Sequence, residues 1–598
     1  MEANQNPNRK SESIRRANRI IQTRSFVLMI LMGVVMFVLL FFRLFDLQIA
    51  RHEELQSKAV NQQTRRTVVT ASRGTIYDTA GNILAISSSA ETIILSPLEI
   101  NNALNDTENP VTWTKDSLAA GLAEILGKDA ASIRKRMDNV KSQYELIQLR
   151  ADEEVAAKVR AYVEENKISG VHLVADTKRY YPYGSLAAQV IGFVGDDNTG
   201  LYGLEAYYEE ELEGQSGLVI SAKDQAENDM LYTYEQYFAA KNGSDLTLTL
   251  DTTIQYYLEK GLEAMTDKFS AANGASGIVM NAKTGGIMAM ASYPNYDLND
   301  FLTVSDQTLQ ERIERGENTL AEMQLLQWRN KALNDTYEPG STFKIVTALE
   351  YMREHPGAYN DYHFDCSGIF SFENNKIQCY HKTAHGSQDF TQAFANSCNG
   401  AFANLGTELD LTSYRNLAEQ LLFNRSLPLD IPYNKSTFSM QADAETWEVL
   451  QTSIGQGQTL MSPMHNLLIT AAIANGGILM KPYLMDHVEN SGGDVIRKFS
   501  PSVAGELMVP NEADALKNLM VQVVNVGTGS ALKRDSYQVA GKTGSAEVDK
   551  AKETHAWFVG FAPADDPKIA VCVIVEEGGS GGHTAAPIAA KLFDAWLQ

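Results

Sequence analysis

The chain has 598 residues, enough for two to four domains, and its 44% hydrophobic and 21% charged residues are typical of a folded globular protein. With 51 Lys and Arg against 74 Asp and Glu the net charge is −23, which argues against nucleic acid as a main partner. Four cysteines without a C-x-x-C motif argue against a disulfide-dense scaffold and a zinc ribbon.

An apolar segment without a charged residue runs from residue 26 to residue 42. With its flanks it is long enough to cross a bilayer, so we expect one transmembrane helix at 25–45. Six basic residues precede it, namely Arg9, Lys10, Arg15, Arg16, Arg19 and Arg24. The positive-inside rule then predicts a cytoplasmic tail at 1–24 and places the rest of the chain outside. A cleaved signal peptide is the alternative, but its apolar region is usually shorter.

Residues 46–250 are predicted to form a mixed domain in which strand-like runs alternate with charged helical stretches. No catalytic spacing occurs there. Three short motifs stand out, RGTIYD from Arg73, RYYPYG from Arg179 and GLE from Gly203. Considered alone, each is typical of a turn, because Gly and Pro mark turns in any protein.

The sequence changes character near residue 245. Residues 246–251 alternate as a strand does, and 277–290 predicts two apolar strands around a turn. At the other end, two more apolar strands are predicted at 555–562 and 569–575, followed by a helix. Mostly helical segments lie between. This order predicts an α+β domain over 251–598 whose two ends pair in one sheet.

Ser341 and Lys344 form a Ser-x-x-Lys pair that follows a Pro-Gly break and opens a helix-compatible run. If a helix begins there, the lysine lies one turn along on the same face, and its amine can reach the hydroxyl. A serine needs a base to act as a nucleophile, and a lysine can serve once burial or nearby cations lower its pKa. The helix N-terminus offers N–H groups for an oxyanion. Alone, this spacing is a common accident.

Two further motifs follow in the chain, Ser397-Cys398-Asn399 and Lys542-Thr543-Gly544. In this order the three motifs form the signature of the penicillin-recognising serine acyltransferases. Lys283-Thr284-Gly285 repeats the third motif, but it precedes the nucleophile and falls in a predicted hairpin turn. We interpret that copy as structural.

On these motifs, and on GGHTAAP near the C-terminus, the chain resembles a class B penicillin-binding protein of the divisional and sporulation branch. These proteins are monofunctional D,D-transpeptidases of cell-wall synthesis. The resemblance implies a pedestal (dimerisation-type) domain at 46–250 and a serine β-lactamase-like transpeptidase domain at 251–598, with helices flanking an antiparallel sheet. It also implies structural roles for the pedestal motif residues, and a charge network among the charged ones: Arg73, Gly74, Asp78, Arg179, Gly184, Gly203 and Glu205.

The resemblance implies a role for each catalytic residue. Ser341 would attack the penultimate D-Ala of a stem peptide and release the terminal D-Ala, with Lys344 as the base. Ser397 would relay a proton to the leaving amine with help from Lys542, and Asn399 would hold the substrate backbone. A β-lactam mimics this first step and stalls at the second.

Substrate binding is assigned to the third motif in the same way. The hydroxyls of Thr543 and Ser545 would hold the terminal carboxylate, and the N–H groups of Ser341 and Ser545 would form the oxyanion hole. Gly544 would let the substrate approach the strand closely. The implied partners are peptidoglycan stem peptides, β-lactams, the cytoplasmic membrane and a polytopic glycosyltransferase; no cofactor is expected.

The cysteines and histidines of one segment resemble a metal site only weakly. Cys366, Cys379, His381 and His385 are spaced C-x12-C-x-H-x3-H, without a tight cysteine pair. We expect no metal, while a Cys366–Cys379 disulfide and free thiols both remain open for an extracytoplasmic domain. The Cys398 thiol is interpreted as a packing group and His385 as a structural residue.

Other functions share parts of this pattern. A D,D-carboxypeptidase differs only in using water as acceptor, and a serine β-lactamase shares the nucleophile but needs no anchor or pedestal. A bifunctional synthase would carry a glycosyltransferase domain, and a β-lactam sensor would need a cytoplasmic output domain. A non-catalytic scaffold is disfavoured by the intact serine and lysines.

Overall fold

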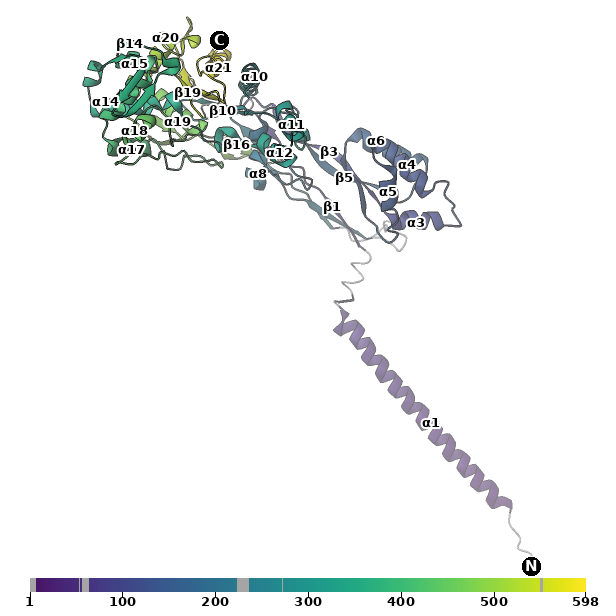
Figure 1. The fold of residues 1–598 in the computed structure, drawn as a ribbon. Coiled ribbons are helices and arrows are strands. Elements are labelled where there is room, and N and C mark those ends of the chain that lie inside the picture. The colour runs from purple at the N-terminus through teal and green to yellow at the C-terminus, as the bar shows by residue number, and fades with distance from the viewer. Residues whose placement is uncertain are drawn as a thin grey trace, which may run out of the picture. The chain divides into compact units, whose positions relative to one another are not determined.

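The computed structural model describes residues 7–52, 54–55, 64–222, 236–271, 273–548 and 552–597 (Figure 1). The chain divides into two compact units, which are described separately. The first comprises Met1–Val69 and Ser216–Ala240, and the second comprises Thr70–Gln215 and Lys241–Gln598.

The first unit contains a long apolar helix and a small sheet. Helix α1 (Pro7–Phe45) continues into one π-helical turn, η1 (Asp46–Ala50). Within the described ranges, Asn18–Ala50 is the one stretch of helix long and apolar enough to cross a membrane, and its side chains are largely exposed. This fits the predicted single-pass anchor. The antiparallel sheet has the order β1 (Thr64–Val69), β6 (Gly217–Ala222) and β7 (Gln236–Phe238).

A seven-stranded sheet forms one part of the second unit, in the order β17-β16-β8-β2-β3-β4, with β5 also paired to β3. Its strands are β2 (Ile76–Tyr77), β3 (Ile83–Leu95), β4 (Glu145–Ala151), β5 (Val171–Tyr180), β8 (Asp245–Leu248), β16 (Met485–Glu489) and β17 (Val495–Lys498). Strands β2 and β8 are parallel, and the other pairs are antiparallel. Strands far apart in sequence therefore share this sheet.

Four helices pack on one end of β3, β4 and β5 and enclose a small core of their own, which includes Ile93, Leu122 and Val159. They are α3 (Pro97–Asn105), α4 (Lys115–Leu126), α5 (Ala130–Arg136) and α6 (Glu153–Glu165). Helix α4 shows why such boundaries form: Thr114 caps its first turn, and Gly127 ends it in the left-handed conformation. Three short helices follow, α7 (Ala188–Ile191), α8 (Gly203–Tyr207) and α9 (Glu209–Leu212).

The other large part of the second unit is built on a five-stranded antiparallel sheet of order β10-β9-β21-β20-β19. The strands are β9 (Ala275–Asn281), β10 (Ile287–Tyr293), β19 (Ala540–Ala546), β20 (His555–Ala562) and β21 (Ile569–Val575). Strand β9 pairs directly with β21. The prediction that the two ends of the α+β domain meet in one sheet is confirmed.

Alternation along the central strands divides the core between the two faces of this sheet. Val571 and Val573 face α10 (Thr252–Phe269) and α21 (Ala585–Leu597), whereas Cys572 and Ile574 belong to the core on the opposite face. That opposite face is covered by α19 (Pro463–Ala474), and α20 (Pro510–Asn525) packs on β19.

The remaining elements surround this framework. The helices are η2 (Leu298–Asp300), α11 (Gln307–Glu314), α12 (Leu320–Trp328), α13 (Lys331–Asn334), η3 (Gly340–Phe343), α14 (Lys344–Glu354), η4 (Ala358–Asp361), η5 (Tyr380–Lys382), α15 (Phe390–Ala395), α16 (Asn399–Glu408), α17 (Leu411–Gln420), α18 (Thr446–Ser453) and η6 (Ser530–Leu532). The strands form three two-stranded pairs, β11 (His363–Cys366) with β14 (Gly386–Asp389), β12 (Ile369–Phe372) with β13 (Asn375–Gln378), and β15 (Ile478–Met480) with β18 (Val503–Glu506).

Candidate active site

The first motif lies where a 3-10 turn passes into a helix. Ser341 belongs to η3, and α14 begins at Lys344, three residues later than the sequence suggested. A 3-10 turn at a helix start is common, and residues three apart eclipse in it, so the serine and the lysine still share a face. Ser341 is half-buried, whereas Lys344 is fully buried.

Two hydrogen bonds attach this turn to the elements around it. The Thr342 hydroxyl accepts from the side chain of Asn466 in α19 at 3.0 Å. The indole N–H of Trp557 in β20 donates to the Glu338 carbonyl at 3.1 Å. Because both donors lie on buried framework elements, the core sets the position of Ser341.

The Lys344 amine points to the second motif. Its Nζ donates to the Ser397 carbonyl at 2.6 Å, to the Ser397 hydroxyl at 3.2 Å and to the Asn399 side-chain oxygen at 2.7 Å. Within the ranges that the structure describes, no group hydrogen bonds to the Ser341 hydroxyl. Lys344 and Ser341 thus share a face of the same turn, as expected. The hydrogen bonds of the Lys344 amine, however, go to Ser397 and Asn399.

Lys542 completes a chain of polar groups. Its Nζ donates to the Ser397 hydroxyl at 2.8 Å and to the Thr543 carbonyl at 2.8 Å. Both lysines are buried, and neither forms an ion pair within the described ranges. Burial lowers the pKa of Lys344 to about 8, although the Cys398 and Cys379 thiols oppose this. Burial, with the charge of Lys344, lowers the pKa of Lys542 well below its usual value.

Ser397 has an unusual backbone conformation. Its φ of 54° lies in the left-handed region, which costs a residue other than glycine about 1–3 kcal/mol. The surroundings hold it there: its N–H donates to the Phe394 carbonyl at 3.1 Å, and the next residue, Cys398, caps α16. Strain of this kind gathers at functional sites, and here it accompanies the contact of Ser397 with both lysines.

The third motif lies on the edge strand β19. The Thr543 hydroxyl is 2.5 Å from that of Thr528, and the Gly581 N–H donates to the Ser545 hydroxyl at 3.4 Å. Lys542, Thr543 and Ser545 thus lie on the same strand, and the Lys542 amine reaches the Ser397 hydroxyl. The structure brings the second and third motifs together beside Ser341.

Gly544 is tightly packed by the protein itself. A Cβ at this position would lie 3.0 Å from the Trp557 Cβ and 3.1 Å from the Thr342 Cγ2. The resemblance accounts for this glycine by the close approach of a substrate. The structure adds a second reason, because a side chain would push β19 away from η3.

Three of the four charged pedestal residues form the predicted network. Glu205 accepts from Arg73 at 2.6 Å and from Arg179 at 2.7 Å, and all three side chains are buried. Arg73 also pairs with Glu209 at 2.6 Å, and Arg179 donates to the Gly74 carbonyl at 2.7 Å. Burial alone would lower the pKa of Arg73, but the two carboxylates raise it. The arginines are therefore held as paired cations.

Asp78 lies outside this network, which corrects the prediction that it belongs to it. It accepts from the backbone and side-chain N–H groups of Asn82 at 2.8 Å and from the Thr252 hydroxyl at 2.9 Å, and it forms no ion pair within the described ranges. Its carboxylate closes a turn and is bound by uncharged donors. Gly184 and Gly203, with φ of 59° and 61°, occupy left-handed positions as turn residues do.

The other Lys-Thr-Gly sequence lies far from this chemistry. Residues 283–285 form the turn between β9 and β10, and Lys283 pairs with Asp566 at the surface. The structural interpretation of this copy is confirmed.

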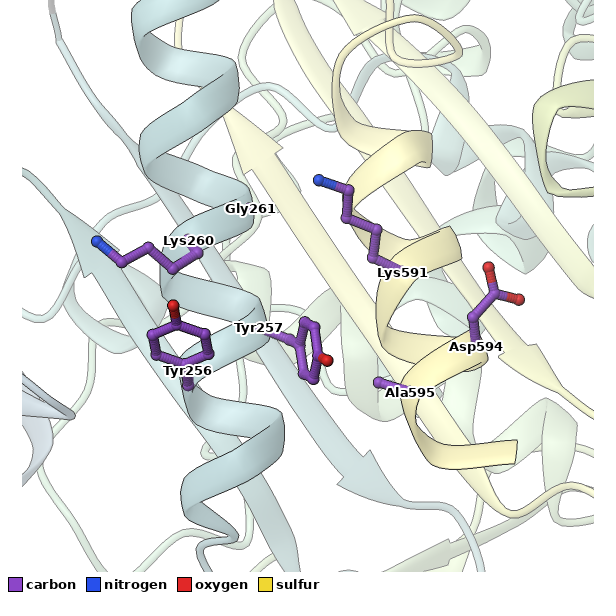
Figure 2. Close-up of a pocket in the computed structure, with 7 residues that line it drawn as sticks. All are labelled: Tyr256, Tyr257, Lys260, Gly261, Lys591, Asp594 and Ala595. Atoms are coloured by element: carbon purple, nitrogen blue, oxygen red, sulfur yellow. The ribbon is translucent and has the colours of Figure 1, made fainter. Parts of the chain in front are cut away.

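A surface pocket between α10 and α21 is equally separate, since it lies on the face of the sheet opposite α19 (Figure 2). None of the predicted site residues lines it. Its lining residues are Tyr256, Tyr257, Lys260, Gly261, Lys591, Asp594 and Ala595.

The cysteine and histidine set differs from the sequence grouping. Cys366, Cys379 and His385 come together with Cys398, whereas His381 is not a member. The sequence indicates only a packing role for Cys398. Its closeness to the other two thiols depends on how β11, β12 and β13 pack against α16. The signal available in the sequence was its position between Ser397 and Asn399.

Two family models and several known proteins match this chain. Residues 275–594, more than half of the chain, match the family model of the penicillin-binding protein transpeptidase domain, and residues 68–248 match that of the penicillin-binding protein dimerisation domain. Stage V sporulation protein D of Bacillus subtilis is 28% identical over 96% of this chain and 86% of its own length. Peptidoglycan D,D-transpeptidase MrdA of Acinetobacter baumannii is 26% identical over 98% and 89%.

Among solved structures, a complex between penicillin-binding protein 2 and MreC from Helicobacter pylori has a similar fold. The TM-score is 0.70 at 21% identity, and the match covers 89% of this chain and 99% of that one. At this identity the likeness concerns the fold alone.

Proposed function

The chain belongs to the penicillin-binding protein family, and we propose that it cross-links peptidoglycan stem peptides as a D,D-transpeptidase, through an acyl-enzyme on Ser341. The observation that carries this proposal is the hydrogen-bonded chain of buried Lys344, half-buried Ser397 and buried Lys542 beside Ser341. Burial lowers the pKa of both amines, which have no carboxylate partner among the described residues, and this makes it easier for one of them to lose its proton and act as a base.

In the acylation step the Ser341 Oγ attacks the carbonyl of the penultimate D-Ala while its proton passes to neutral Lys344. The tetrahedral intermediate then collapses as the C–N bond breaks. The leaving amine of the terminal D-Ala takes a proton from the Lys344, Ser397 and Lys542 chain. The 2.8 Å and 3.2 Å contacts of the Ser397 hydroxyl with the two amines support such a relay.

Substrate binding is assigned to the residues around this chain. The side-chain N–H of Asn399 and β19 bind the stem peptide as an added strand, and the hydroxyls of Thr543 and Ser545 bind its terminal carboxylate. The N–H groups of Ser341 and Ser545 stabilise the oxyanion. In the second step an amine of a neighbouring stem attacks the ester carbonyl, and Ser341 regains its proton. A β-lactam acylates the same serine.

The setting of the activity is part of the proposal. The chain comprises a cytoplasmic tail at 1–24, a transmembrane helix at 25–45, a pedestal at 46–250 and the transpeptidase domain at 251–598, which is extracytoplasmic. The basic residues before the apolar segment support this orientation. Similarity to stage V sporulation protein D supports a role in septal or spore wall synthesis, and the proposed protein partner is a polytopic glycosyltransferase.

The test is labelling of the full chain in detergent by a fluorescent penicillin, followed over hours. Wild type is expected to bind the label persistently, and Ser341→Ala is expected to bind none. The two Lys-Thr-Gly sequences provide a matched pair: Lys542→Met should slow labelling by about 10²- to 10⁴-fold, and Lys283→Met should leave it unchanged. Circular dichroism of each variant checks folding.

The outcomes separate the alternatives. Rapid loss of label would indicate a β-lactamase, and hydrolysis of a stem-peptide analogue without transfer to an added amine would indicate a carboxypeptidase. A folded wild type that neither binds penicillin nor turns over a D-Ala thioester would contradict catalysis and favour a scaffold.

A further inference from the structure

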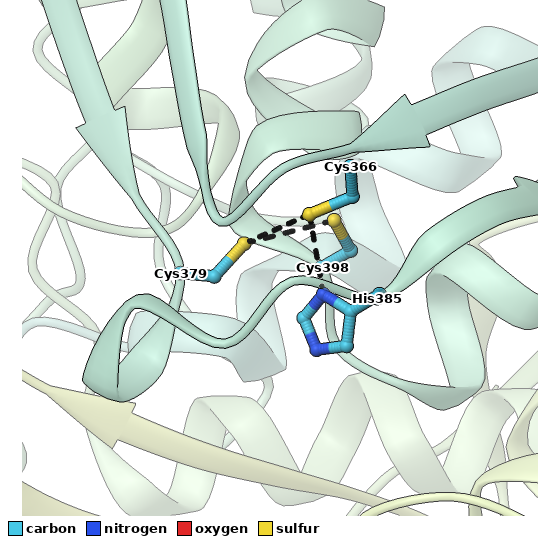
Figure 3. Close-up of side chains that lie close together, drawn as sticks. All are labelled: Cys366, Cys379, His385 and Cys398. Carbon is cyan, nitrogen blue, oxygen red and sulfur yellow. Dashed lines mark hydrogen bonds between the residues drawn. The ribbon is translucent and has the colours of Figure 1, made fainter.

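Three thiols and one imidazole converge next to the second motif (Figure 3). Cys366 ends β11, Cys379 precedes η5, His385 precedes β14, and Cys398 caps α16. Their sulfur and nitrogen atoms all lie within 4.8 Å of one another. Four separate chain segments therefore point a metal-ligating atom at one small volume.

The distances agree with the edges of a metal tetrahedron. The Cys379 sulfur is 3.7 Å from the Cys366 sulfur and 3.7 Å from the Cys398 sulfur, and the His385 Nδ1 is 3.4 Å from the Cys366 sulfur. Zinc–sulfur bonds of about 2.3 Å and zinc–nitrogen bonds of about 2.0 Å in tetrahedral geometry place two sulfurs about 3.8 Å apart, and sulfur and nitrogen about 3.5 Å apart.

The surroundings are those of a closed site. The three cysteines are buried and His385 is half-buried. The Gly368 N–H donates to the Cys366 sulfur at 3.4 Å, and the Ala401 N–H, in the first turn of α16, donates to the Cys398 sulfur at 3.4 Å. Backbone donors of this kind stabilise the thiolate form and orient ligands from outside the metal shell.

We propose that Cys366, Cys379, His385 and Cys398 form a structural Zn²⁺ site. Four protein ligands fill a tetrahedral zinc shell and leave no open position, as in structural sites. On binding, each cysteine ligates as a thiolate, its proton passes to solvent, and no electron is transferred. A disulfide explains the cluster less well, since Cys379 is equally distant from two sulfurs and one thiol and the imidazole would remain unused.

The site has a consequence for the second motif. Cys398 lies between Ser397 and Asn399, and the Asn399 side chain donates to the carbonyl of Gln378, the residue before Cys379. Zinc would thus join the two strand pairs, β11 with β14 and β12 with β13, to the start of α16. It would hold the strained Ser397 in place beside the lysines, as a positioning device rather than a catalytic metal.

The experiment measures zinc in the full chain, purified in detergent without a metal-affinity tag and then dialysed. Mass spectrometry of the metal is expected to find about one zinc per chain. Cys379→Ser and His385→Ala should each bind zinc at least tenfold more weakly. Cys572→Ser, a buried cysteine outside the cluster, and His381→Asn, a neighbouring histidine outside it, are the controls and should keep the zinc.

A second measurement, made on wild type alone, tests the site even if the variants fail to fold. Wild type stripped of metal and loaded with Co²⁺ should show the visible absorption of tetrahedral cobalt bound to thiolates. Wild type that takes up no zinc or cobalt would overturn the proposal, and thiol counting would then distinguish a disulfide, with two reactive thiols, from four free thiols. Zinc that persists in both cluster variants would also overturn it.

Metal content and penicillin labelling are independent readouts, so failure of this proposal and of the proposed function can be distinguished. Removal of zinc is expected to slow penicillin labelling and to lower the unfolding temperature. The final amount of penicillin bound per Ser341 should stay the same.

Discussion

In the pedestal, Arg73 and Arg179 are buried around the carboxylate of Glu205, whereas in the catalytic region Lys344 and Lys542 are buried around the hydroxyl of Ser397. Both sites place two cationic side chains within reach of one central residue. They differ in whether that residue carries the opposite charge.

This difference separates a structural from a chemical use of buried cations. A carboxylate offsets the desolvation of the arginines and keeps them charged, so the group acts as a fixed cross-link between β5, α8 and the RGTIYD segment. A hydroxyl offers no such charge, and burial then lowers the pKa of each lysine. We therefore assign a structural role to the pedestal site and, as proposed above, proton transfer to the site of the two lysines.

The largest expected effect follows from removing the buried amine of Lys344. Lys344→Met keeps the approximate volume of the side chain and removes its amine. Penicillin labelling should slow by about 10²- to 10⁴-fold, because the base is lost. The unfolding temperature should change little, because the loss of three hydrogen bonds opposes the gain from removing a buried amine without a carboxylate partner. A clear loss of stability with unchanged labelling would contradict the comparison; Lys283→Met is the control.

The opposite pattern is expected in the pedestal. Glu205→Gln leaves Arg73 and Arg179 buried without their shared carboxylate and should cost about 3–5 kcal/mol of stability. Thermal unfolding of the full chain in detergent measures it. Glu210→Gln, an exposed residue of α9, should change little. If the two variants unfold at the same temperature, the network does not stabilise the pedestal.

The pH dependence of labelling tests the protonation state of Lys344. The pKa of Lys344 is lowered to about 8. As the pH rises toward that value, the fraction of neutral Lys344 increases about tenfold per pH unit, and above it the fraction levels off. The rate constant of labelling should therefore rise from pH 6 to 8 and then become flat. Glu210 is exposed and takes no part in the hydrogen bonds of Lys344, so the control variant Glu210→Gln should give the same profile. A rate that falls with rising pH would exclude Lys344 as the base.

The smallest effect is expected at Asp78, which accepts hydrogen bonds but pairs with no cation. Asp78→Ala should cost about 1–2 kcal/mol, less than Glu205→Gln, because it leaves unsatisfied donors but no unpaired buried charge. Unfolding temperatures of the two variants compare them directly, and penicillin labelling at 25 °C should be unchanged. An effect as large as that of Glu205→Gln would return Asp78 to the charge network.

Local patterns predicted much of the fold. The hairpin at 277–290, the C-terminal strands and the apolar anchor each follow from periodicity or apolar length, which act over short distances along the chain. The sharing of one sheet by β8 and β16 was not predictable, because the pairing depends on contacts between segments more than 200 residues apart.

The candidate site shows the same division. The sequence identified Ser341, Lys344, Ser397 and Lys542 by motif, but it suggested a direct bond between the first two. The structure instead directs the Lys344 amine to Ser397 and Asn399, because the start of α16 and the residue two before it place three acceptor atoms within its reach.

The sequence by itself determined which chemical groups the protein has and the order in which they occur, since motifs, charge and apolar length are properties of the chain. The tertiary structure decided which of these groups are partners. Asp78 and Glu205 are both pedestal carboxylates, yet only Glu205 is enclosed by arginines, and His385 but not His381 meets the three thiols. Burial and close approach between distant segments set these partnerships, and both arise only when the core forms.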